Sequence, residues 1–64
     1  MTMRLYVETM DATVVEVSAD GRVRLENEEW MTPSLQERRA IIYSAQQELA
    51  ALAELIEILE GLGP

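Results

Sequence analysis

Residues 32–62 read TPSLQERRAIIYSAQQELAALAELIEILEGL, and this stretch decides the fold because it predicts one long helix. Thr32 and Pro33 suit a helix start, since threonine can accept a hydrogen bond from a free amide and proline is pre-set for the first turn. Ser34 and Glu37 offer an alternative capping box two residues later. Strong helix formers then run without Gly or Pro as far as Gly61.

This helix is longer and more apolar than the rest of the chain can cover. Residues 33–60 would span roughly 42 Å at about 1.5 Å per residue, whereas strands of about six residues span roughly 20 Å. Because a monomer rarely leaves a large apolar patch in water, we expect the second half of the helix to form a homodimer. The predicted dimer interface is Leu49, Leu52, Leu55, Ile56, Leu59 and Leu62. A helical hairpin broken near residues 43–44 is the alternative, and no turn residues favour it.

Residues 3–26 predict a three-stranded antiparallel meander. Strands are expected at 3–9, 13–18 and 22–26, where apolar and polar residues alternate, with turns at 10–12 and 19–21. Residues 27–31 form an acidic linker to the helix. The fold class is therefore α+β, with residues 1–64 as a single domain.

The apolar pattern also predicts the strand register. A three-residue loop with a left-handed Gly21 pairs Val17 with Val23, Val15 with Leu25, and Glu16 with Arg24. The same kind of loop at 10–12 pairs Leu5 with Val17 and Val7 with Val15. One apolar face results, which we expect the helix to cover through Leu35, Ile41, Ile42 and Tyr43; the face comprises Met3, Leu5, Val7, Val15, Val17, Val23 and Leu25. The outer face comprises Arg4, Tyr6, Glu8, Val14, Glu16, Arg22 and Arg24.

Composition excludes several classes of function. The 64 residues carry a net charge of −7, and all five basic residues are arginine. Such a balance disfavours direct contact with nucleic acid or anionic membranes and suits a basic partner. Without cysteine or histidine, disulfides and the usual zinc sites are excluded. No apolar run is long enough for a leader or a membrane span, so we expect a cytoplasmic protein.

No combination of residues predicts catalysis, a metal site or a cofactor. We therefore expect a non-enzymatic protein that binds a basic protein partner, for which a nucleic-acid-binding complex is the natural example. The candidate partner-binding residues are Glu26, Glu28, Glu29, Trp30, Tyr6 and Glu16. For Trp30 the alternative is a structural plug at the open end of the core, and for the acids it is a solvated loop.

A very small, acidic chain without lysine or cysteine, and expected to dimerise, resembles the inhibitors that phages and mobile elements carry, such as anti-CRISPR proteins. That resemblance implies a nucleic-acid mimic that blocks a basic surface. The alternatives are an antitoxin-like or immunity-like partner of a basic protein, and a structural dimerisation module.

Overall fold

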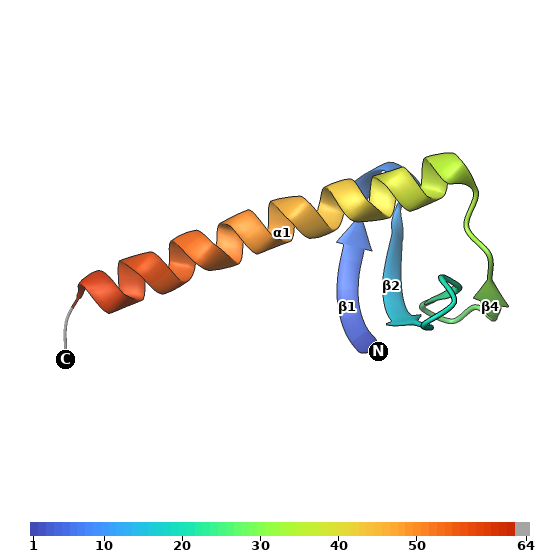
Figure 1. Cartoon of the computed structure of the whole chain (residues 1–64), viewed down its shortest axis with the longest axis horizontal. Coiled ribbons are helices and arrows are strands. Elements are labelled where there is room, and N and C mark those ends of the chain that lie inside the picture. Colours follow the sequence, from blue (N-terminus) through green and yellow to red (C-terminus); the bar gives the residue numbers. More distant parts are fainter. Residues whose placement is uncertain (63–64) are drawn as a thin grey trace.

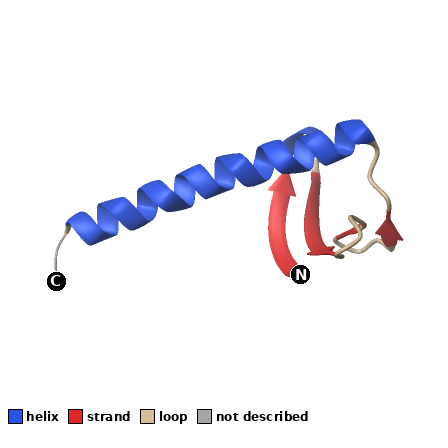
Figure 2. Ribbon diagram, viewed as in Figure 1, coloured by secondary structure: helices blue, strands red, loops and turns tan. Residues whose placement is uncertain are grey.

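The structure, a computed structural model, describes residues 1–62. It is an α+β fold in which a four-stranded antiparallel sheet, ordered β1-β2-β3-β4, carries one long helix at its end (Figure 1). The elements are β1 (Thr2–Val7), the 3-10 turn η1 (Glu8–Met10), β2 (Ala12–Val17), β3 (Val23–Leu25), β4 (Trp30–Met31) and α1 (Leu35–Gly61). The molecule is a rod of 44 × 20 × 20 Å because the helix projects far beyond the sheet (Figure 2).

The sheet has four strands where the sequence predicted three. Trp30 pairs with Arg24 and Met31 with Val23, so the segment expected to be a linker ends in an edge strand. Asn27, at φ 63°, turns the chain between β3 and β4, and the Glu28 amide donates to the Leu25 carbonyl at 3.1 Å. A strand of two residues is too short to show any periodicity, which is why the pattern did not reveal it.

The helix starts at the second of its two candidate caps. Ser34 has an extended backbone, its hydroxyl accepts from the Glu37 amide at 3.1 Å, and the Glu37 carboxylate accepts from the Ser34 amide at 2.8 Å. This reciprocal pair satisfies two amides that would otherwise lack partners. The capping box is therefore confirmed, and the cap lies two residues after the predicted start at Thr32.

The turn between β2 and β3 has the predicted geometry. Val17 pairs with Val23 and Glu16 with Arg24, and Gly21 lies at φ +89°. The Gly21 amide donates to the Ser18 carbonyl at 3.1 Å, as a tight turn followed by a left-handed residue requires.

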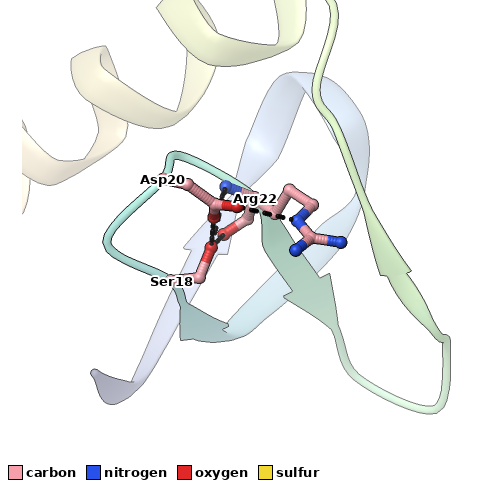
Figure 3. A network of polar contacts seen from close by, with 3 residues as sticks. All are labelled: Ser18, Asp20 and Arg22. Carbon is pink, nitrogen blue, oxygen red and sulfur yellow. Dashed lines mark hydrogen bonds and ion pairs between the residues drawn. The ribbon is translucent and has the colours of Figure 1, made fainter.

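Polar side chains close this turn from inside (Figure 3). The Ser18 hydroxyl donates to the Asp20 carboxylate and accepts from the Arg22 amide at 3.0 Å, while Arg22 Nε donates to Asp20 Oδ2 at 3.1 Å. The hydroxyl of Ser18, helped by Arg22, lowers the pKa of Asp20. Asp20 is therefore ionised at neutral pH and keeps both contacts.

A β-bulge changes the register beyond Glu16. Leu25 pairs with Val14 rather than with Val15, because Val15 is the extra residue that faces no partner on β3. The bulge turns Val14 inward, where it is fully buried in the core, although alternation had placed it on the outer face. Val15 is also buried but lies outside the core cluster.

The first hairpin differs from its predicted register by three residues. β1 ends at Val7 instead of Thr9, since η1 and a left-handed Asp11 at φ 49° close the turn. Leu5 therefore pairs with Val14 and Val7 with Ala12, and neither expected partner, Val17 or Val15, is correct. Aspartate adopts the left-handed region more readily than most residues, which explains how a turn without glycine forms here.

The core lies on one face of the sheet and is small. Its buried members are Leu5, Val7, Val14, Val23 and Leu25, with Met3, Met10, Ala12, Val17, Met31, Ala40 and Ile41 packed against them. Apart from Val15, every residue of the predicted apolar face belongs to this set. From the helix, only Ile41 of the four expected contacts takes part, while Leu35, Ile42 and Tyr43 are exposed. A helix side chain reaches the sheet only within a narrow stripe, and these three lie outside it.

Substitution of Gly21 by Val should lower the free energy of unfolding by more than about 1 kcal/mol, because a β-branched residue resists a positive φ. A Cβ at this position would meet no atom within 4 Å, so the cost arises from the backbone alone. Urea unfolding followed by circular dichroism measures it. Gly21→Asn is the matched control, since Asn tolerates this region and should cost less. Equal stability of Gly21→Val and wild type would contradict the left-handed turn.

Candidate protein-binding surface

The last two thirds of α1 are exposed to solvent. Every residue from 45 to 62, which we call the helix tail, is exposed. The tail includes seven large apolar side chains whose exposed fractions lie between 47% and 76%: Leu49, Leu52, Leu55, Ile56, Ile58, Leu59 and Leu62. An apolar surface of this density on a short segment is typical of a protein–protein interaction site.

The tail is uncovered because the strands cross the helix instead of running along it (Figure 1). α1 contacts chiefly β1 and η1. A helix of 27 residues spans roughly 40 Å at about 1.5 Å per residue, whereas neighbouring strands are only about 4.8 Å apart. The helix therefore runs across the strands, and the sheet covers only as much of the helix length as the sheet is wide. The helix residues that it half buries are Glu37, Ala40, Ile41 and Ser44.

Acidic residues accompany the apolar ones in the tail, which contains four glutamates and no basic residue. At 100° per residue, Glu54 and Glu57 lie on the side opposite Leu52. Glu60 borders the apolar arc, and Glu48 lies within it, at the point where the helix leaves the sheet. The two arginines of the helix, Arg38 and Arg39, both belong to its first turns.

Three of the six predicted partner-binding residues have contacts within the chain. Arg4 forms an ion pair with Glu26, and Arg24 binds Glu16 at 2.8 Å. The Tyr6 hydroxyl donates to Asp11 Oδ1 at 2.7 Å. These contacts neutralise two of the acids that were expected to face a basic partner.

The other three lie together in the β3–β4 hairpin. Glu28 and Glu29 are exposed in its loop and form no ion pair within residues 1–62. Trp30 follows them on β4 with 44% of its surface exposed. It shares a row with Arg24 and therefore faces away from the core, so Met31 fills the position that the plug interpretation gave to Trp30.

A shallow groove of about 260 Å³ separates the end of β1 from the helix. Its lining includes both tyrosines of the chain and two acids but no basic residue, so it is unsuited to an anionic ligand. The lining residues are Tyr6, Glu8, Thr9, Tyr43, Ser44, Gln47 and Glu48. The sequence did not predict this groove, because the helix angle that brings Tyr43 beside Tyr6 depends on the first hairpin.

Other kinds of site find no support in the described part of the chain. No three His, Cys, Asp or Glu side chains are grouped so that they could hold a metal ion within residues 1–62. Over the same residues, no helix combines the length and hydropathy of a membrane span. No family model, curated protein or solved structure matches the chain.

The hydrogen bond to Asp11 should be visible in the titration of Tyr6. Donation to this carboxylate stabilises the neutral phenol and raises the pKa of Tyr6. In a Tyr43→Phe background, where Tyr6 is the only tyrosine, Asp11→Gly should lower that pKa toward its ordinary value of about 10. Glycine is chosen because it tolerates the positive φ of this position.

Absorbance of the tyrosinate measures the effect, with Asp20→Gly as a control that removes a carboxylate elsewhere. Because the folded pKa is the higher one, the stabilisation is complete below the unfolded pKa and is lost as the pH rises through the folded pKa. An unchanged Tyr6 titration in Asp11→Gly would contradict this contact.

Proposed function

We propose that this chain is a non-enzymatic protein-binding protein that forms a homodimer through the helix tail and presents acidic residues to a basic partner. The observation that carries the proposal is that every residue from 45 to 62 is exposed. Burial of a fully exposed Leu or Ile side chain contributes on the order of 1.5–3 kcal/mol. Pairing of two tails would therefore add a large stabilising free energy to a chain whose own core is small.

A second copy is the occupant that best fits the tail. Six apolar residues are buried within residues 1–62 and none of them belongs to α1, which is little for a chain of 64 residues. Chains of this size usually need a disulfide, a metal or oligomerisation to be stable, and this chain has no cysteine. A second copy of the chain supplies the same apolar tail, and it is present wherever the chain itself is made.

The acidic surface supports a basic partner. Glu28 and Glu29 at the hairpin tip are exposed without an ion pair in residues 1–62, and a dimer would carry twice the net charge of −7. Surfaces that bind DNA or RNA are the commonest strongly basic surfaces, and acids can occupy them in place of phosphates. An inhibitor of a nucleic-acid-binding protein, of the phage or mobile-element type, is the function that combines these features.

The Leu52→Glu variant should sediment as a monomer at micromolar concentrations where the wild type is a dimer, because the charge would be buried in an apolar interface. Its dissociation constant should rise at least about 100-fold, which corresponds to roughly 2.7 kcal/mol. Ala50→Glu introduces the same charge on the opposite side of the helix and should leave the dimer intact. A wild-type monomer in sedimentation equilibrium would refute the homodimer.

Reversal of the hairpin charges tests the basic partner. Once a partner has been isolated from a lysate with this chain as bait, Glu28→Lys/Glu29→Lys should slow association about tenfold, since charge complementarity acts chiefly on the association rate. The melting temperature should hardly change, because exposed acids contribute little to folding. Surface plasmon resonance at two salt concentrations measures the rate.

Glu54→Lys/Glu57→Lys is the matched control, with the same change of net charge on the helix tail. If both double variants slow association equally, net charge rather than the hairpin attracts the partner. If neither variant nor added salt has an effect, the nucleic-acid mimic is wrong, and the structural dimerisation module is then the better account.

A further inference from the structure

We propose that two copies of α1 pair in antiparallel orientation and in one register, in which Arg39 of each copy lies beside the partner's Glu60. This pairing rests on the homodimer of the proposed function and specifies its geometry. It follows from three features of the described helix: a continuous apolar stripe, the position of the sheet, and the distribution of charge.

The stripe follows the spacing of a coiled coil. Apolar residues recur at intervals of three and four, which places them along one seam of the helix. Each of them is exposed, so the seam is free along its whole length; its members are Ile42, Ala45, Leu49, Leu52, Ile56 and Leu59. Arg38, four residues before Ile42, occupies the next position of the same seam.

The sheet does not block this seam. The helix residues that the sheet half buries, at 37, 40, 41 and 44, centre about 100° away from the seam around the helix axis. A second helix can therefore lie along the full seam, including the first third of α1, which carries the sheet. This distinguishes the seam from the helix tail as a whole, because it extends back to Ile42 beside the core.

The charges of α1 favour antiparallel pairing. Both arginines occur at 38 and 39, next to the single acid Glu37, whereas the acids at 48, 54, 57 and 60 belong to the second half. A parallel pair would place Arg38 against Arg38 in the seam and acids beside acids. An antiparallel pair brings the basic end of each helix to the acidic end of the other, and it also opposes the two helix dipoles.

Only one register fills the seam with apolar contacts. In this register the seam forms three kinds of apolar contact, and each occurs twice by symmetry. The contacts are Ile42 with the partner's Leu59, Ala45 with the partner's Ile56, and Leu49 with the partner's Leu52. The flanking positions bring Arg39 beside the partner's Glu60, also twice.

The two neighbouring registers, in which one helix is shifted by seven residues, form fewer apolar contacts in the seam. In one direction Arg38 faces the partner's Ile56, so a charge enters an apolar layer. In the other direction only residues 49, 52, 56 and 59 still have apolar partners. The apolar pattern and the charge pattern thus select the same register independently.

Charge reversal tests the predicted contact between Arg39 and Glu60. Arg39→Glu alone and Glu60→Arg alone each place like charges side by side at both ends of the dimer. Each should weaken dimerisation about tenfold or more at low salt, since every surface pair changes from attraction to repulsion. An equimolar mixture of the two variants should recover wild-type affinity, because each heterodimer again has an acid beside an arginine at both ends.

Two controls accompany this experiment. Glu57→Arg has the same charge change as Glu60→Arg but lies away from the seam, and should not weaken the dimer. Arg39→Glu/Glu60→Arg in one chain keeps the wild-type net charge and should dimerise like the wild type. If the mixture is no tighter than the separate variants, the register is wrong.

A distance measurement tests the orientation without touching the interface. The chain contains no cysteine, so Gln36→Cys provides a unique site for a spin label on an exposed residue of the first helical turn. In the proposed pairing the two labels lie about 43 Å apart along the helix axis, and in a parallel pair they lie within about 20 Å. A short distance would overturn the antiparallel pairing and leave the homodimer intact. A wild-type monomer in sedimentation would overturn both.

Discussion

The structure depends on a mismatch between one helix and the sheet that holds it. The sheet contacts α1 across its width, through Ala40 and Ile41, and leaves everything beyond Ser44 in solvent. A core cluster of five buried residues that includes none from the helix is small even for a chain of this length. The apolar side chains of the tail are thus the largest unused source of stabilisation in the molecule.

The same mismatch accounts for an otherwise unfavourable feature of the helix. Acids late in a helix lie near the negative end of its dipole, which costs a few tenths of a kcal/mol each, and no basic residue is present in the last turn of α1. If a second helix lies antiparallel, its positive end and its two arginines come close to these acids. An arrangement that is unfavourable within one chain becomes favourable between two.

The hairpin between β3 and β4 determines where the exposed acids of the sheet lie. Ion pairs to Arg4 and Arg24 hold Glu26 and Glu16 on the sheet, so the unpaired charge of this region is concentrated in the exposed loop at Glu28 and Glu29. The hairpin tip is formed by residues from the segment that the sequence predicts as a linker. Pairing of β4 with β3 converts it into a fixed part of the sheet.

The sequence by itself determined the long helix, the three longer strands and the turn at Gly21, because each of these depends on residues close together in the chain. It also offered the capping box at Ser34 and Glu37 as one of two helix starts. It also determined that the helix is too long for its sheet, since that follows from lengths alone. Only the tertiary structure decided the turn at Asp11, the bulge at Val15 and the strand at Trp30–Met31. These depend on which strand ends meet across the sheet. A shift of one residue in the pairing moves side chains to the other face of the sheet, as at Val14. The local alternation of apolar and polar residues does not indicate such a shift.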